Sequence, residues 1–373
     1  MATKNAETIV RELLSIAGVT VSGSNPFDIN VHNKNFYNRV LNDHTLGLGE
    51  SYMDGWWDCE ALDQLIDRIL RAKLQDKIKN SLKLKWHILR SKLFNLQKPR
   101  RSFQVGRKHY DIGNNLFMAM LDKRMNYSCA YWKSANNLDE AQENKLELIC
   151  KKLGLKPGMK ILDLGCGWGS FARYAAEKFK VHVTGLCVSK NQIEYGRELC
   201  KGLPVELKVQ DYRKADGKYD RVISIGFMEH VGYKNYRTYM KVVNSTLKEN
   251  GISLLHTIGG NVSMTTANPF TTKYIFPNGS IPSITQLGRA IEGIFVVEDW
   301  HNFGPDYEKT LLAWYRNFEK SWPELKNEYN ERFFRMWRYY LLTSAGGYRS
   351  RLNQLWQIVL TKPGNKQPDC RFS

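Results

Sequence analysis

The sequence Lys160-Ile-Leu-Asp-Leu-Gly-Cys-Gly-Trp-Gly-Ser170 joins a short apolar run to a glycine-rich turn. Apolar residues then recur with helical spacing over Phe171–Phe179, so the predicted order is strand, tight loop and helix. An α/β sheet uses this order to present backbone N–H groups and a helix N-terminus to a ligand. Gly165, Gly167 and Gly169 lack a Cβ atom, which lets the backbone turn sharply or approach a bound molecule.

Asp163 stands two residues before the first of these glycines, where a carboxylate can face a cation. A Gly-x-Gly-x-Gly pattern by itself can be a structural turn and nothing more. The combination resembles the S-adenosylmethionine (SAM) loop of class I methyltransferases, and the loop lacks the Gly-Lys-Ser/Thr of a phosphate loop. This resemblance implies SAM contacts from Asp163, Gly165, Cys166, Gly167 and Gly169.

Apolar runs alternate with helical patterns after roughly residue 106. This alternation predicts an α/β fold with a doubly wound parallel sheet and a ligand at the carboxyl ends of its strands. The predicted strands are Lys160–Leu164, Val181–Cys187, Val205–Gln210, Tyr219–Ile225, Gly251–Ile258, Phe295–Trp300 and Leu355–Thr361.

The N-terminal part of the chain is predicted to be mainly helical. Helical spacing of apolar residues covers Thr8–Ala17, Phe36–Leu41 and Leu62–Leu70. The aromatic, glycine-rich segment Leu46–Trp57 between them is either core packing with a turn or a functional element. We expect a smaller helical domain over 1–92, a linker over 93–107 and a SAM-dependent catalytic domain over 108–373.

The composition indicates an anionic partner. The 373 residues include 55 Lys and Arg against 37 Asp and Glu, a formal net charge of +18, so nucleic acid and an anionic membrane are both candidates. No apolar run approaches the roughly 20 residues that span a bilayer, and no secretory signal is recognisable, so membrane contact would be peripheral. The seven scattered cysteines indicate reduced thiols in a cytoplasmic protein and no metal site.

Positive charge is concentrated between Arg68 and Lys108, where Asp76 is the only acidic residue. Apolar residues, Trp86 among them, interleave at nearly i, i+4 spacing. A basic amphipathic helix is typical of a segment that lies on anionic lipid or contacts nucleic-acid phosphates. A solvated helix face is the ordinary alternative. The break at Pro99 suggests the linker.

Candidate catalytic side chains stand at predicted strand ends, where this type of sheet builds its site. Glu229 follows the fourth strand and His256 lies near the end of the fifth, while Cys129 lies upstream in Asn126-Tyr-Ser-Cys-Ala-Tyr-Trp132. Each alone could be a surface acid, a core histidine or a small buried thiol. Their joint placement favours a functional site.

These motifs together closely resemble the cyclopropane-fatty-acyl-phospholipid synthases and the related mycolic acid cyclopropane synthases, over nearly the whole chain. The resemblance implies methylene transfer from SAM to the cis double bond of an acyl chain in a membrane phospholipid. The motifs that carry it are Gly-Leu-Gly-Glu-Ser-Tyr-Met-Asp-Gly-Trp-Trp57, His109-Tyr-Asp111, Tyr127-Ser-Cys-Ala-Tyr-Trp132, Leu162-Asp-Leu-Gly-Cys-Gly-Trp-Gly169, Glu229-His-Val-Gly232, Lys273-Tyr-Ile-Phe-Pro-Asn-Gly279 and Asp299-Trp-His-Asn-Phe-Gly304.

The resemblance also implies the site residues. A bound bicarbonate ion would be the base, held in an anion cage formed by Cys129, Glu229, His256, the backbone of Ile258 and Tyr307, with Gly226 adjacent. Besides the glycine loop, SAM would contact Tyr127, Ser128, Ser189, Gln192, Asp211 and Tyr212. Gln192 would replace the acid that many class I enzymes carry after the second strand. Ser344 stands where some members have a cysteine, which argues against obligatory thiol catalysis there.

Three other functions stay open. A small-molecule N- or C-methyltransferase would share part of the motif set, and a lipid-binding scaffold could carry an inactive cofactor fold. A nucleic-acid methyltransferase is disfavoured because no Asn/Asp-Pro-Pro-Tyr motif is present, so no nucleic-acid partner is expected. The favoured function implies an anionic phospholipid bilayer with unsaturated acyl chains as partner, at the inner face of the cytoplasmic membrane. The resemblance further implies a homodimer formed through the N-terminal region.

Overall fold

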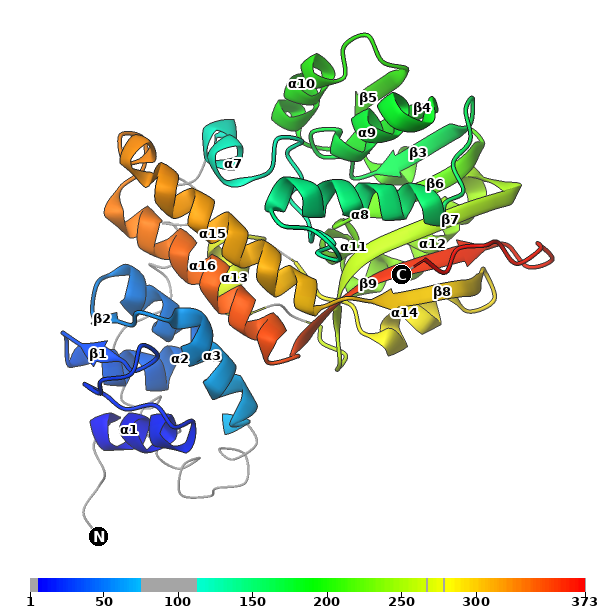
Figure 1. Ribbon diagram of the computed structural model, residues 1–373. Helices are drawn as coiled ribbons and strands as arrows, with labels where there is room; N and C mark the ends of the chain where they lie inside the picture. The colour runs from blue at the N-terminus through cyan, green and yellow to red at the C-terminus, as the bar shows by residue number, and fades with distance from the viewer. Residues whose placement is uncertain (1–5, 75–112, 266–267, 278, 373) are drawn as a thin grey trace. The chain divides into compact units, whose positions relative to one another are not determined.

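The computed structural model describes residues 6–74, 113–265, 268–277 and 279–372, which form two compact units (Figure 1). The first unit comprises residues up to Met120 together with Ala267–Pro277 and Leu311–Leu352. The second comprises Leu121–Thr266, Asn278–Thr310 and Asn353–Ser373. The expected linker over 93–107 and most of the basic segment lie outside the described residues, so the predicted domain boundaries stay a prediction.

The second unit is built on a seven-stranded sheet in the order β5-β4-β3-β6-β7-β9-β8. All seven predicted strands are present, with ends that differ from the prediction by a few residues. The strands are β3 (Lys160–Leu164), β4 (His182–Cys187), β5 (Val205–Val209), β6 (Tyr219–Ile225), β7 (Leu247–Gly260), β8 (Val296–Asn302) and β9 (Asn353–Thr361).

The five strands from which the parallel sheet was predicted, β3 to β7, are parallel as expected, whereas β9 runs antiparallel to both of its neighbours. The chain between β8 and β9 forms two consecutive helices, α15 (Pro305–Leu325) and α16 (Glu331–Arg349). A single crossover helix carries the chain from the carboxyl ends of the strands back to their amino ends. A pair of helices can instead return the chain to the carboxyl ends that it left. The strand that follows must then run backwards.

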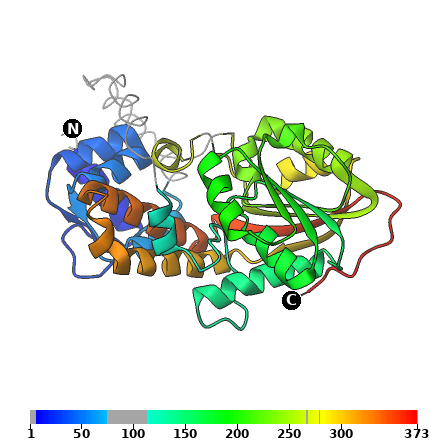
Figure 2. The same ribbon diagram turned by 90° about the horizontal axis from the view of Figure 1, so that it is seen from above.

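Two helical layers cover the faces of this sheet (Figure 2). In β3, Ile161 packs into one core with α8 (Leu138–Lys152), α9 (Ser170–Phe179) and α10 (Lys190–Leu199). The next residue, Leu162, packs into the other with α11 (Met228–Val231), α12 (Tyr236–Thr246) and α14 (Ile284–Ile291). Successive strand residues are therefore buried on opposite faces, as expected for a sheet covered on both sides.

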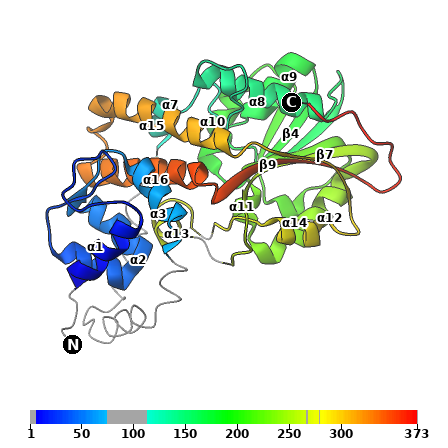
Figure 3. The ribbon, with the colours of Figure 1, turned by 60° about the horizontal axis from the view of Figure 1, so that its bottom comes forward.

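The first unit is mainly helical, as predicted for the N-terminal part (Figure 3). In it α16 packs on α2 (Asn35–Met53) and α3 (Leu62–Arg71). No helix in the described part of the chain is long and apolar enough to span a membrane. The remaining elements of the first unit are α1 (Ala6–Ile16), β1 (Asn30–Val31), β2 (Trp57–Asp58), α7 (Asn114–Met120), α13 (Pro269–Tyr274) and the later part of α15.

The aromatic, glycine-rich segment Leu46–Trp57 proves to be core packing. Trp57 is completely buried and its indole N–H donates to the Ser51 hydroxyl at 3.0 Å. The carboxylate of Glu50 accepts from Lys273 Nζ at 2.5 Å and from the Tyr274 hydroxyl at 2.7 Å. Two of the motifs that carry the family resemblance are thus joined by a buried ionic contact.

Candidate active site

The predicted SAM loop lies between β3 and α9 at the carboxyl edge of the sheet. Gly165, Gly167 and Gly169 have φ values of +86°, +55° and +79°, in the region that favours glycine. A Cβ on Gly165 would lie 2.4 Å from Phe227 Cδ2, so close packing excludes a side chain there. A Cβ on Gly167 would meet no heavy atom within 4 Å, so the Gly167 backbone is open to a ligand.

Near the end of β4, where Gln192 is predicted to replace the acid of many class I enzymes, Gly185 is closely packed. A Cβ on Gly185 would lie 2.7 Å from Leu207 Cδ2 and 2.9 Å from Cys166 Cβ, so no larger residue fits. The next turn holds the predicted replacement. The Ser189 hydroxyl caps α10 by accepting from the Gln192 N–H, and the Gln192 side-chain oxygen accepts from Cys187 Sγ at 3.3 Å.

Asp211 and Tyr212 follow β5. Both carboxylate oxygens of Asp211 accept from the Arg213 guanidinium, at 2.9 and 2.5 Å, and this contact lowers the pKa of Asp211 to about 2. The Tyr212 ring packs edge-on against Phe227, with ring centroids 5.5 Å apart. Phe227 also contacts Gly165, so one aromatic side chain connects the first glycine of the loop to this predicted adenine contact.

Glu229 occupies the place where β6 stops beside β7. The last residue of β6, Ile225, lies opposite His256, and the following Gly226 N–H donates to the His256 carbonyl at 2.9 Å. Beyond that point the Ile258 N–H donates to Glu229 Oε1 at 2.6 Å. The carboxyl group therefore continues the hydrogen-bond ladder where the strand ends.

The other oxygen of this carboxyl group, Glu229 Oε2, is buried and has no hydrogen-bond partner among the described residues. Burial raises the pKa of Glu229 to about 7, against an ordinary value of 4.5. Near neutral pH, Glu229 is therefore protonated in a large fraction of the molecules. Because Oε1 already accepts from the backbone, the protonated form presents an unpaired O–H donor at Oε2.

His256 lies two residues before Ile258 on β7. Its Nδ1 lies 3.3 Å from Nε2 of Gln357 on β9. The amide nitrogen is a donor, so Nδ1 accepts and the neutral ring carries its proton on Nε2. Burial lowers the pKa of His256 well below its usual value. Nε2 is buried without a partner within the described ranges, which gives the predicted anion cage a second unpaired donor.

Cys129 and Tyr307, the other predicted members of the cage, are also buried. The Cys129 thiol donates to the Ala130 carbonyl at 3.2 Å, and burial raises the pKa of Cys129 well above its usual range. The thiol therefore stays neutral at physiological pH. Thr310, near Tyr307 on α15, accepts from the Ala130 N–H at 3.1 Å and from the Trp132 indole at 3.0 Å.

Three contributors to this region were not predicted from the sequence. Gln357 orients His256, while Gln142 and Lys145 on α8 bind the segment that contains Tyr127 and Ser128. A glutamine inside the apolar run Leu355–Thr361 is an available signal, because a polar side chain buried in a covered strand needs a partner. The two α8 residues resemble a solvated helix face in the sequence.

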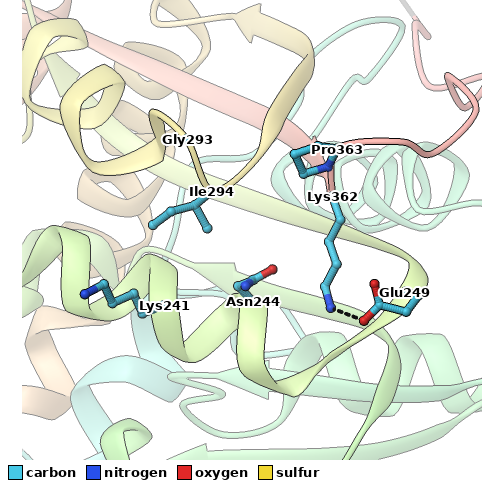
Figure 4. A pocket seen from close by; sticks show the side chains of 7 residues that line it. All are labelled: Lys241, Asn244, Glu249, Gly293, Ile294, Lys362 and Pro363. Carbon is cyan, nitrogen blue, oxygen red and sulfur yellow. Dashed lines mark hydrogen bonds and ion pairs between the residues drawn. The ribbon is translucent and has the colours of Figure 1, made fainter.

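A hollow of about 540 Å³ lies away from these residues, near the amino end of β7 (Figure 4). An ion pair crosses it, with Lys362 Nζ 2.8 Å from Glu249 Oε1. No predicted site residue lines it, so it does not bear on the SAM loop or the anion cage. The lining residues are Lys241, Asn244, Glu249, Gly293, Ile294, Lys362 and Pro363.

Glu229→Gln is expected to stabilise the protein at alkaline pH. The folded state holds the Glu229 proton up to a pKa of about 7, whereas an unfolded chain loses it near 4.5. The folded state therefore binds more protons between these values, and stability falls as the pH rises through them. Glutamine removes this loss, which amounts to about 3 kcal/mol.

Chemical denaturation of both proteins between pH 4 and pH 8 checks this. The free energy of unfolding of the variant should rise relative to that of the wild-type protein as the pH rises. The difference between the two proteins should vanish near pH 4. A difference that does not depend on pH would show that Glu229 titrates normally in the fold.

Comparison with known proteins adds to this geometry. Residues 97–358 match the protein family that is described as "Mycolic acid cyclopropane synthetase". The chain is 51% identical over 354 residues to the cyclopropane-fatty-acyl-phospholipid synthase of Escherichia coli K12, which covers 95% of this chain and 93% of that protein.

Solved structures give the same result. The cyclopropane synthase MmaA2 from Mycobacterium tuberculosis matches with a TM-score of 0.64 and 28% identity, over 72% of this chain and all of that chain. Mycolic acid cyclopropane synthase CmaA1, solved with SAH and CTAB, matches with a TM-score of 0.63 and 30% identity, over 72% of this chain and 99% of that chain. These findings confirm the predicted class I SAM-dependent methyltransferase fold and the prediction that the chain is an enzyme. The chain belongs to the mycolic acid cyclopropane synthetase family.

Proposed function

We propose that the protein transfers a methylene group from SAM to the cis double bond of unsaturated acyl chains in membrane phospholipids, with bicarbonate as the base. The product is a cyclopropane fatty acyl chain. The observation that carries this proposal is the pair of buried, unpaired polar atoms Glu229 Oε2 and His256 Nε2 near the carboxyl edge of the sheet. The likeness to the Escherichia coli synthase over nearly the whole chain supports the choice of substrate.

The chemistry needs an apolar and rigid site. An alkene is a weak nucleophile, so it must be held in line with the sulfonium methyl group, in a place that excludes water. Attack leaves a methylated chain with carbocation character, which aromatic faces can stabilise. Phe303 supplies such a face near the anion cage, with its ring centroid 5.9 Å from that of His256 and 5.4 Å from that of Tyr131.

The residues present fit an anion. A buried polar group without a partner is costly, and two unpaired donors near one strand end suit a ligand that accepts hydrogen bonds from both. The neutral Glu229 O–H and the His256 N–H are these donors, and Gln357 fixes the tautomer of the second. When bound, bicarbonate supplies a base for the proton that the new methyl group loses before the ring closes.

The substrate requires a membrane partner. We propose that the enzyme is cytoplasmic, acts as a homodimer and associates peripherally with anionic lipid at the inner face of the cytoplasmic membrane. The net charge of +18 supports this, since each Lys or Arg near an anionic surface contributes about 1 kcal/mol. Sedimentation of the protein with anionic vesicles, and its release by salt, tests the association. Light scattering that shows only monomers would contradict the dimer.

Incubation of the purified protein with SAM and vesicles of unsaturated phospholipid tests the reaction. Mass spectrometry should show acyl chains that have gained one CH₂ and lost the double bond, and removal of bicarbonate should slow the gain. Product that keeps the alkene, or activity on soluble amines without vesicles, would indicate a different methyltransferase. Turnover that does not change with bicarbonate would remove the proposed base.

A further inference from the structure

Two side chains of helix α8 bind the segment Asn126–Cys129 by hydrogen bonds. Gln142 and Lys145 stand three residues apart on this helix and therefore share a face. Gln142 Nε2 donates to the Ser128 carbonyl at 2.9 Å. Lys145 Nζ donates to Asn126 Oδ1 at 2.9 Å and to the Ser128 hydroxyl at 3.1 Å. Gln142 Nε2 also donates to the Asn126 carbonyl at 3.4 Å, so four bonds bracket Tyr127, which lies between the two anchored residues.

Asn126 is also fixed by hydrogen bonds to Asp122. Its N–H donates to Asp122 Oδ1 at 2.8 Å, and its side-chain amide donates to Asp122 Oδ2 at 2.9 Å. Lys145 Nζ therefore binds an amide oxygen whose position is already determined. The segment cannot move without breaking several buried hydrogen bonds together.

Both side chains on α8 are poor choices for stability alone. Gln142 and Lys145 are completely buried. The amide oxygen of Gln142 has no hydrogen-bond partner in the part of the chain that the structure describes. Burial lowers the pKa of Lys145 to about 8. An apolar side chain of similar size would avoid both desolvation penalties, and polar groups that weaken the fold are typical of functional sites.

We infer that Gln142 and Lys145 are positioning residues that fix Tyr127 and Ser128 for SAM binding. Neither needs to touch the ligand, because each acts through the backbone or side chains of the segment. The identity of the ligand that the segment meets rests on the proposed function. Cys129 follows in the same segment, so the placement of the cage thiol depends on the same anchors.

Gln142→Met separates positioning from packing. Methionine keeps the length of the side chain and removes the unpaired oxygen, but it also leaves the Ser128 and Asn126 carbonyls without the Gln142 donor, so the melting temperature should fall slightly and the Kd is corrected for the folded fraction. We expect the Kd for SAM, measured by calorimetry without lipid, to rise about tenfold. In turnover assays the KM for SAM should rise more than kcat falls. A purely structural role would leave the Kd unchanged, and a native Kd in this variant overturns the inference.

Lys145→Met has a matched control in Lys152→Met. Lys152 is also completely buried on α8, but its ammonium binds Asp299 Oδ2 at 2.7 Å and lies 3.2 Å from His301 Nδ1, whereas that of Lys145 bonds to Asn126 and Ser128. Both variants should melt at lower temperature, and only Lys145→Met should weaken SAM binding, by tenfold or more. Equal Kd values in the two variants, corrected for folded fraction, would overturn the inference. If Lys145→Met does not fold, Gln142→Met decides.

The outcomes distinguish this inference from the proposed function. A native protein that binds SAM but does not modify vesicle lipid would contradict the proposed function and leave the positioning role as measured. A native Kd in Gln142→Met would contradict the positioning role even if the lipid reaction proceeds.

Discussion

Replacing His256 with alanine is expected to lower turnover by roughly 100-fold or more while SAM still binds with nearly native affinity. The variant removes the unpaired Nε2–H donor of the anion cage, and loss of one such buried donor typically costs a factor of 10²–10³. The SAM loop is built from β3, α9 and their connection, so its geometry should not depend on this ring. The measurements are the vesicle assay for kcat and calorimetry for the Kd of SAM.

Two further variants sharpen this test. Glu229→Gln keeps an acceptor for the Ile258 N–H and an N–H donor for the anion, but its amide cannot release a proton, so it should lose most turnover because the side chain then no longer ionises. Gln357→Leu leaves the imidazole in place and removes only the group that orients it, so a smaller loss is expected. Full activity in both His256→Ala and Glu229→Gln would remove the cage assignment.

Gly167→Ala is expected to raise the Kd for SAM by tenfold or more. Its new methyl group would project into open space beside the loop, where the cofactor should approach the backbone. The φ value of +55° also strains any residue other than glycine, at a cost of about 1–2 kcal/mol in stability. Calorimetry and thermal melting measure the two effects separately.

Gly202→Ala is the matched control. Gly202 has a φ value of +80° and likewise no heavy atom within 4 Å of a Cβ, but it lies in the turn between α10 and β5. The control should lose similar stability and keep its affinity for SAM. If both variants bind SAM equally well, the open face of Gly167 is not where the cofactor lies.

The sheet was largely predictable because its strands are covered on both faces. Short, mainly apolar segments bounded by glycine locate β3 and β6, and the alternation of strand and helix sets the parallel order. The direction of β9 was not predictable, since the largely apolar stretch Leu355–Thr361 can pair in either direction. In α2 the residues after Leu41 were not predicted as helix, because Gly47 and Gly49 weaken the helical pattern there. The structure continues α2 to Met53 across a kink at His44, where φ is +50°.

The proximity of the candidate residues Glu229 and His256 was predictable from the order of the strands. Glu229 and His256 stand at strand ends, and the topology of an α/β sheet brings strand ends together. The roles of Gln142, Lys145 and Gln357 can be inferred only from the groups to which they form hydrogen bonds. A sequence does not show that a glutamine amide meets a backbone carbonyl or an imidazole, so these contacts required the structure.

SAM that carries a trideuterated methyl group offers the most direct test of methylene transfer. The native enzyme would be incubated with this donor and vesicles of unsaturated phospholipid, and the acyl chains analysed by mass spectrometry. Cyclopropane formation predicts a saturated product that retains two of the three deuterium atoms, because the base removes the third as a deuteron before the ring closes. Product that retains all three, or that retains the alkene, would contradict the account.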